Sequence, residues 1–364
     1  MNNKRKSSIE LLRIISMFMI VAYHWQLHAA NDSIYCSSLN ANQIFSFGIG
    51  SWGALGVDIF FIISAYFLLN SNSIKTHKLL NMIVKVSIYG TVLVLVAICC
   101  DVIPFEAKTL VKSVMGVFAY QYWFITVYII IYILHPALNK IIKQAECKYL
   151  ILLTGTLVCT TYFTGYVFGQ GEFIGRLACG ITIYVLVGTF ERFPRWNLFE
   201  KFRRSGMICS LLGIFMLEVL LSYLGNRTNE TFYFSCIKKI QITDSVLMLI
   251  AGLFMFYFFK NLNLKYNAMI NFCGRYIVGA YMLHGGAYFI KDFLWDGLFS
   301  AGLYYNKSFG VYSLYYLICI FGLLFVGILS EFLYTKIIER NIEKVYRKIN
   351  LSEEISINNN DIHL

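Results

Sequence analysis

Three ionisable side chains lie within the first apolar segment of this 364-residue chain. Glu10 and Arg13 are three residues apart, and Arg13 and His24 are eleven residues apart. Both spacings bring the side chains onto one face of an α-helix, with Arg13 and His24 about 16 Å apart along its axis. Such an arginine can bind an anion, and such a histidine can act as a general base. The structural alternative is a snorkelling arginine with a hydrogen-bonded histidine.

A carboxyl group in the next apolar segment is the second candidate for chemistry. Asp58 lies near the middle of the sequence from Gly53 to Ala65. A carboxylate beside an imidazole orients the ring and stabilises its protonated form. We therefore predict that Asp58 orients His24, with a purely structural hydrogen bond of Asp58 as the alternative.

Other ionisable groups are distributed over the later apolar segments, namely Lys85, Arg176, Glu218, Arg275 and His284. A charged group inside a membrane-spanning helix costs at least about 2.5–3.5 kcal/mol, so such groups are candidates for function, although each taken alone is more often structural. Together they predict a polar cavity, with Arg13, Lys85 and Arg275 at its cytoplasmic mouth.

The histidines and cysteines do not have the spacing of a metal site. His24 and His28 are four residues apart but lack the surrounding HExxH pattern, and the ten cysteines contain no CxxC pair. We therefore expect no metal, and we interpret the cysteines within apolar runs as small buried hydrophobes.

The composition indicates the elements that hold these groups. The chain is 58% hydrophobic and only 14% charged, whereas soluble proteins carry about 25% charged residues. A net charge of +11 in a soluble protein could suggest a nucleic-acid partner. In this chain the distribution of the basic residues along the sequence is more informative than their sum. We therefore predict an integral membrane protein and no nucleic-acid partner.

Apolar stretches long enough to cross a bilayer recur along the whole chain. They lie near 9–29, 45–69, 79–100, 119–138, 149–168, 173–190, 207–225, 244–260, 270–291 and 311–334, with a short interfacial piece at 110–121. The predicted fold is all-α, a polytopic helical bundle with about ten transmembrane helices in one domain over residues 1–350. Residues 351–364 form a short polar cytoplasmic tail, disordered from Ser352 onward.

The distribution of Lys and Arg sets the orientation of this bundle. With the N-terminus inside, the inner segments hold 20 of the 31 basic residues, the outer loops seven, and the spans four. An even number of spans gives this alternation, so both termini are predicted to be cytoplasmic. Glu10, Arg13 and His24 interrupt the first segment, which is also too long for the apolar core of a signal peptide, so we expect it to be retained.

The ordered motifs resemble those of the membrane acyltransferase-3 family of bacterial O-acyltransferases. The resemblance covers residues 8–335 and rests on Glu10–Arg13 with His24, Gly56–Ser64, Tyr122–Phe124 followed by Pro136–Asn139, Arg176, and Tyr281–His284. One departure is Ala65, where the family has glycine. The chain also lacks the C-terminal esterase-like domain that some members carry.

The resemblance implies a cytoplasmic acyl-CoA donor, commonly acetyl-CoA, and an acceptor hydroxyl on an envelope, capsular or exopolysaccharide or its lipid-linked precursor. In this interpretation His24 and Asp58 are catalytic, with His24 acting as general base or through an acyl-imidazole. The donor-binding residues are Arg13, Glu10, Lys85 and Arg275. The acceptor-binding residues are Arg176, Trp123 and His284, although from physics alone Trp123 is an interfacial aromatic anchor.

Two classes of function therefore remain for a multi-pass protein of the bacterial cell membrane. One is an O-acetyltransferase, which the ordered motifs favour. The other is a transporter or lipid-linked oligosaccharide flippase, because charges and glycines within membrane helices suit translocation equally well. Binding or turnover of acetyl-CoA discriminates between the two.

Overall fold

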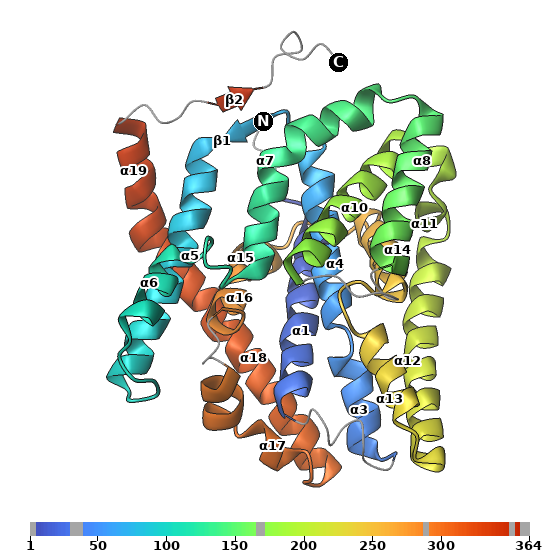
Figure 1. The fold of residues 1–364 in the computed structure, drawn as a ribbon, viewed down its shortest axis with the longest axis vertical. Helices are drawn as coiled ribbons and strands as arrows, with labels where there is room; N and C mark the ends of the chain where they lie inside the picture. Colours follow the sequence, from blue (N-terminus) through green and yellow to red (C-terminus); the bar gives the residue numbers. More distant parts are fainter. Residues whose placement is uncertain (1–4, 30–38, 165–171, 287–290, 349–353, 357–364) are drawn as a thin grey trace.

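The computed structural model describes residues 5–29, 39–164, 172–286, 291–348 and 354–356. It confirms the predicted all-α class, because the described residues form a helical bundle with only two three-residue strands (Figure 1). Seven of the described helices are long and apolar enough to cross a bilayer. Two shorter apolar helices, Cys147–Phe163 and Val246–Lys260, lie at further predicted spans.

The first helix, α1 (Ser7–Ala29), lies at the centre of the bundle (Figure 1). Its main neighbour is α4 (Gly53–Leu68), which follows α3 (Ala41–Gly50) after a break at Ser51 and Trp52. The two helices approach so closely at Gly56 that a Cβ atom there would lie 2.5 Å from the backbone oxygen of Ser16. Glycine thus permits the contact that places both predicted catalytic segments side by side.

The remaining long helices and the shorter α14 surround this pair. They are α5 (Thr76–Cys99), α7 (Trp123–Gln144), α10 (Glu172–Arg192), α12 (Arg203–Thr228), α14 (Val246–Lys260) and α18 (Phe309–Tyr334). Large apolar side chains such as Leu212 and Met216 on α12 and Phe325 on α18 are exposed. A helix that is apolar on its outer face suits a lipid surface, as the composition predicted.

Shorter pieces complete the chain and connect these helices. They are α6 (Ala107–Met115), α8 (Cys147–Val158), η1 (Cys159–Thr164), η2 (Pro194–Trp196), α11 (Leu198–Lys201), α13 (Thr231–Ile240), η3 (Lys291–Leu298), α17 (Ala301–Tyr304), η4 (Thr335–Glu339) and α19 (Arg340–Lys348). The interfacial piece predicted at 110–121 corresponds to α6, which begins three residues earlier.

The ninth predicted span, 270–291, is not one continuous helix. It comprises α15 (Ala268–Tyr276) and α16 (Val278–His284), and its last part, 287–290, lies outside the described residues. The polar sequence around Arg275 approaches the start of α1, whereas the apolar α16 packs against α18. Both halves of this span thus contact α1 and α18, with α15 mainly against α1 and α16 mainly against α18.

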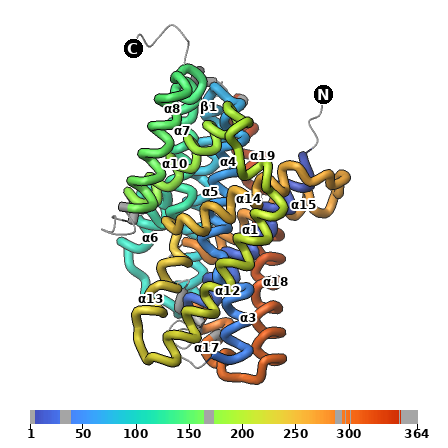
Figure 2. Tube along the Cα trace, turned by 90° about the vertical axis from the view of Figure 1, so that its right-hand side faces the viewer, coloured from blue at the N-terminus to red at the C-terminus, as the bar shows by residue number. Residues whose placement is uncertain are grey.

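The two ends of the bundle differ in what they contain. The strands β1 (Ser73–Lys75) and β2 (Glu354–Ser356) and the helix α19 lie at one end, and α3, α13 and α17 at the other (Figures 1 and 2). We call these the strand end and the opposite end. β2 pairs antiparallel with β1, so this part of the tail, predicted to be disordered, is a strand. The charge distribution predicts that the strand end is cytoplasmic.

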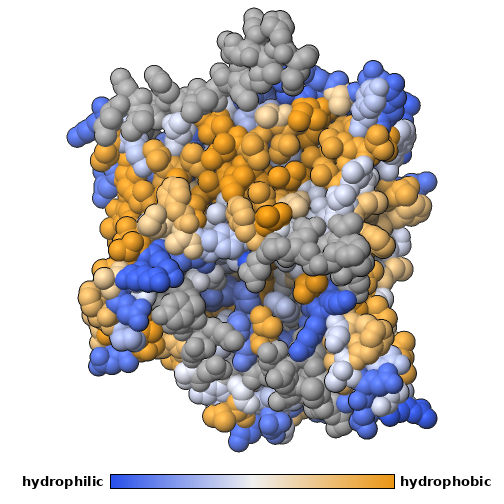
Figure 3. Space-filling view, in the orientation of Figure 1, coloured by the Kyte–Doolittle hydropathy of each residue, from blue (hydrophilic) through white to orange (hydrophobic). Residues whose placement is uncertain are grey.

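The surface has the character expected of a membrane protein. A broad apolar band crosses the face formed by α5, α7 and α8, and a more hydrophilic region lies between this band and the opposite end (Figure 3). Soluble monomers rarely expose contiguous apolar patches larger than a few hundred Å², so such a band is typical of a surface in contact with lipid. The chain is accordingly a multi-pass membrane protein.

Candidate functional site

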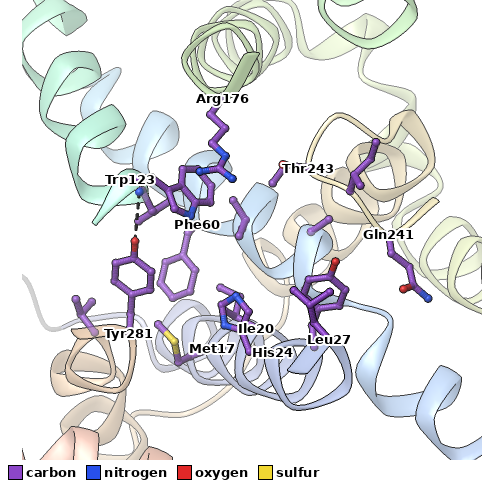
Figure 4. Close-up of a pocket in the computed structure, with 17 residues that line it drawn as sticks. Met17, Ile20, His24, Leu27, Phe60, Trp123, Arg176, Gln241, Thr243 and Tyr281 are labelled. Carbon is purple, nitrogen blue, oxygen red and sulfur yellow. Dashed lines mark hydrogen bonds between the residues drawn. The ribbon is translucent and has the colours of Figure 1, made fainter. Parts of the chain in front are cut away.

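A cavity in the middle of the bundle contains His24 on its wall, and we call it the His24 cavity (Figure 4). Five elements and one loop form it: α1, α4, α7, α10, α16 and the segment between α13 and α14. Its lining residues include Tyr23, His24, Val57, Phe60, Trp123, Phe124, Arg176, Thr243, Val278 and Tyr281. The lining is mainly apolar, as in most small-molecule sites, with few polar groups to orient a ligand.

His24 is surrounded by aromatic rings and not by carboxylates among the described residues. The His284 ring on α16 meets it edge to face at a centroid distance of 4.9 Å, and His28 stacks on its other side at 5.9 Å. The ring of Tyr23 lies 6.0 Å away. His284 was predicted to bind the acceptor; the structure places it against His24 and outside the lining of the cavity.

Asp58 does not have the position that the sequence suggested. It is buried in α4, but it faces α14, because a Cβ atom built on Gly252 would lie 3.7 Å from its own Cβ. Val57 and Phe60 on the same helix line the His24 cavity instead. Among the described residues no hydrogen bond joins Asp58 to His24, and the Oδ2 atom of Asp58 is without a partner. The predicted orienting contact is therefore not formed.

Two of the three residues predicted to bind the acceptor, Arg176 and Trp123, contact each other in the structure. The Arg176 guanidinium lies over the Trp123 indole, 4.4 Å from its centroid. Both face the cavity from the wall across from His24 (Figure 4). This stacking holds the arginine in place and leaves its charge at the cavity.

A second cavity, towards the strand end, is lined by cationic side chains, and we call it the basic cavity. Arg5, Arg13, Lys85 and Arg275 line it, with Glu331 as the one carboxylate. The sequence predicted that Arg13, Lys85 and Arg275 share a mouth, and the structure brings these three together. Four cations against one carboxylate suit a polyanionic ligand.

Ion pairs fix two of these cations. Glu10, which is buried, lies 3.4 Å from Arg13 and 3.3 Å from Arg5, so the predicted Glu10–Arg13 pair is confirmed. Gly274 of α15 covers Glu10 so closely that a Cβ atom there would lie 2.6 Å from its carboxylate. The Glu10–Arg13 ion pair thus orients the Arg13 side chain at the basic cavity.

Lys85 pairs with Glu331 of α18, and Tyr89 donates a hydrogen bond of 3.2 Å to the other carboxylate oxygen. Glu331 is not among the predicted site residues. It lies within the predicted span 311–334, and an ionisable group within a span, like Asp58, is the signal that identifies it. Glu331 reduces the net charge that Lys85 brings to the basic cavity.

The two cavities share one boundary. Phe60, Phe124 and Val278 line both of them, and we call these three residues the constriction. On its other side the basic cavity shares Arg13, Ser64 and Lys85 with a vestibule that Lys75 and Lys78 also line. The vestibule, the basic cavity and the His24 cavity therefore adjoin one another in this order, with the constriction between the last two.

The described residues hold no group of three His, Cys, Asp or Glu side chains that could bind a metal ion. His24, His28 and His284 are neighbours by their rings, and their aromatic contacts extend to Trp295. The described groups with which the site could do chemistry are the His24 imidazole and the cations Arg176, Arg13 and Arg275.

Comparison with known proteins gives one match. A family model described as an acyltransferase domain matches residues 6–332, from the start of α1 almost to the end of α18. No curated protein and no solved structure matches the chain. The matched range includes the His24 cavity, the constriction, the residues of the basic cavity except Arg5, and the vestibule residues on α1, α4 and α5.

Proposed function

Because the chain belongs to the acyltransferase-3 family and is a multi-pass membrane protein, we propose that it moves an acetyl group from acetyl-CoA to a sugar hydroxyl of the bacterial cell envelope. The acceptor is an envelope, capsular or exopolysaccharide or its lipid-linked precursor. One observation carries the proposal: the basic cavity and the His24 cavity meet at the constriction.

The donor fits the charge and the length of these adjoining cavities. The phosphates of CoA are anionic, and Arg5, Arg13 and Arg275 supply guanidinium groups that bind phosphate in two-point contacts. Arg13 and His24 are about 16 Å apart along α1, a distance that an extended pantetheine arm spans. The thioester then lies beyond the constriction while the nucleotide stays in the basic cavity and vestibule.

The reaction needs two proton transfers, one from the acceptor hydroxyl and one to the departing sulfur. His24 removes the proton of the acceptor hydroxyl, and the hydroxyl oxygen attacks the thioester carbon. The C–O bond forms, the C–S bond breaks, and the imidazolium returns the proton to the departing sulfur. The products are the acetyl ester and CoA with a free thiol, so no further reactant is required.

The acceptor enters the His24 cavity opposite this histidine. Arg176 and Trp123 form that wall and offer a cation and an aromatic edge to a glycan (Figure 4). If the strand end faces the cytoplasm, as the basic residues predict, the donor is bound from inside and the acceptor nearer the outer face.

The test uses the purified full-length chain in lipid nanodiscs with acetyl-CoA labelled in its acetyl group. We expect release of the CoA thiol and transfer of label to glycan extracted from the envelope. His24→Ala should abolish both without reducing the amount of protein in the membrane. His135→Ala is the matched control, because His135 is buried in α7 and is not among the residues that line the His24 cavity.

Two results would contradict the proposal. One is full transfer of label by His24→Ala. The other is movement of a lipid-linked oligosaccharide across the membrane of proteoliposomes with neither thiol release nor transfer of label. That second outcome would favour the flippase.

A further inference from the structure

A general base must present a lone pair to its substrate, and in histidine this depends on where the other ring nitrogen keeps its proton. His24 faces its cavity, but its Nδ1 atom is buried and has no hydrogen-bond partner in the described structure. Asp58 faces α14 and does not bond to this nitrogen. Another group must therefore hold the His24 ring in its working tautomer.

His284 has a nitrogen suited to that task. Its Nδ1 atom lies 2.5 Å from the carbonyl oxygen of Ala280, one turn earlier on α16. A carbonyl oxygen only accepts, so Nδ1 carries the proton and Nε2 of the neutral ring carries a lone pair. This Nε2 atom is buried and also lacks a partner. His284 thus has an unused acceptor, Nε2, and the neighbouring His24 has a nitrogen, Nδ1, that lacks a partner.

The two rings are neighbours that meet edge to face at 65° with their centroids 4.9 Å apart. Neither nitrogen has a partner in the described structure, so the N–H···N bond forms when the rings rotate until the two nitrogens point at each other. Leaving both nitrogens unpaired in a buried site is destabilising, because neither group recovers the hydrogen bond it makes with water. Pairing them removes that cost.

The other groups around this pair are aromatic or neutral. His28 and Tyr23 approach His24 from α1. Tyr281 lies 6.2 Å from His284 on α16, and Trp295 of η3 approaches the same ring at 6.2 Å. Arg176 faces the cavity from the opposite wall, and no carboxylate is among the described residues that line the His24 cavity. His284 is therefore the acceptor with the best position.

We propose that His284 is the positioning residue of His24. Its Nε2 atom accepts the Nδ1–H of His24, which leaves the lone pair of His24 Nε2 directed into the cavity. His284 itself touches neither donor nor acceptor. The inference rests on the proposed function only in taking His24 as the base, because the hydrogen bond itself can be observed without turnover.

The experiment compares His284→Ala with His284→Gln in the full-length chain in nanodiscs. Alanine removes the acceptor, whereas the glutamine amide oxygen can still accept a hydrogen bond but cannot titrate. His135→Ala is the matched control, because His135 is also buried and its Nδ1 atom also lies 2.5 Å from a carbonyl, that of Tyr132. Nitrogen NMR of labelled histidine reports the tautomer of His24, whose signal is identified by its loss in His24→Asn.

We expect the Nδ1–H signal of His24 to be lost or mixed in His284→Ala and retained in His284→Gln and His135→Ala. With acetyl-CoA as the probe, kcat for thiol release should fall about 100-fold in His284→Ala, with KM unchanged within about twofold. The kcat of His284→Gln should be at least about tenfold higher than that of His284→Ala. An unchanged His24 signal in His284→Ala would overturn the inference, as would a folded His284→Gln no more active than alanine.

The failures of the two proposals are distinguishable. If His24→Asn keeps its activity, the proposed role of His24 is wrong, whatever the NMR spectra show. If His24→Asn is inactive but His284→Ala keeps both its activity and the His24 tautomer, only the role of His284 is wrong. Should alanine prevent folding, His284→Gln and the NMR spectrum still decide.

Discussion

Arg13 is held by Glu10, one turn earlier on the same helix, with 3.4 Å between its Nη1 atom and the carboxylate. The carboxylate is buried, while about a quarter of the Arg13 side chain, 26%, stays exposed at the basic cavity. The pair thus orients a cation without covering it. The two cavities adjoin each other near this helix.

Arg13→Ala should weaken binding of the donor more than it slows the chemistry. We expect KM for acetyl-CoA to rise about tenfold or more, because loss of a charge-assisted contact costs about 1.5–3 kcal/mol, while kcat changes little. Lys143→Ala is the control, because Lys143 is an exposed cation of α7 that bonds to Asn72 and lines none of the described cavities. Equal changes of KM in both variants would argue against a specific phosphate contact at Arg13.

Gly274→Ala should destabilise the protein by about 1–3 kcal/mol. The new Cβ atom would lie 2.6 Å from the Glu10 carboxylate and 3.0 Å from the Glu10 backbone oxygen, so the helices must move apart. Gly322→Ala is the control, since nothing lies within 4 Å of its added Cβ. Thermal unfolding in detergent measures both, and a variant at Gly274 as stable as that at Gly322 would contradict the close approach.

Val278→Phe should separate binding from transfer. The larger ring fills the constriction between Phe60 and Phe124, so acetyl-CoA still reaches the basic cavity but its thioester does not reach His24. We expect binding of labelled acetyl-CoA within about threefold of the parent and thiol release reduced about 100-fold or more. Val278→Ile, which adds one methylene, serves as the control. Undiminished turnover in Val278→Phe would exclude this passage as the path of the thioester.

The ion pair of Lys85 and Glu331 should show strong coupling in a double-mutant cycle. Breaking a buried pair costs about 3–5 kcal/mol, whereas replacing both partners by apolar residues is often neutral. Lys85→Met or Glu331→Leu alone should therefore destabilise the chain more than the two together. Additive losses of unfolding free energy would indicate that the partners act independently.

The sequence was informative wherever one helix carried the whole pattern. Glu10, Arg13 and His24 lie on α1 at fixed rotations, so their common face and the Glu10–Arg13 pair could be predicted. The apolar segments likewise predicted the helical class. The break between α15 and α16 was not visible, because a continuous apolar pattern does not show where a chain changes neighbours.

Contacts between helices were the part that could not be predicted. Asp58 lies at a suitable depth for His24, but the rotation of α4 about its own axis turns it towards α14. A single sequence does not determine that rotation. His284 is the opposite case: the chain separates it from His24 by 260 residues, and only the packing of α16 brings the two rings together.

The pairing of β2 with β1 also decides how this protein can be handled. Ser73 to Lys75 bond to Ser356 to Glu354, and Lys75 lines the vestibule. A fluorescent protein or affinity tag inserted directly after Ser356 would therefore lie near the vestibule, where it can obstruct the donor. Fusions at the loop between α12 and α13 avoid that region, and a removable tag after Ser356 would reveal the obstruction as activity gained on cleavage.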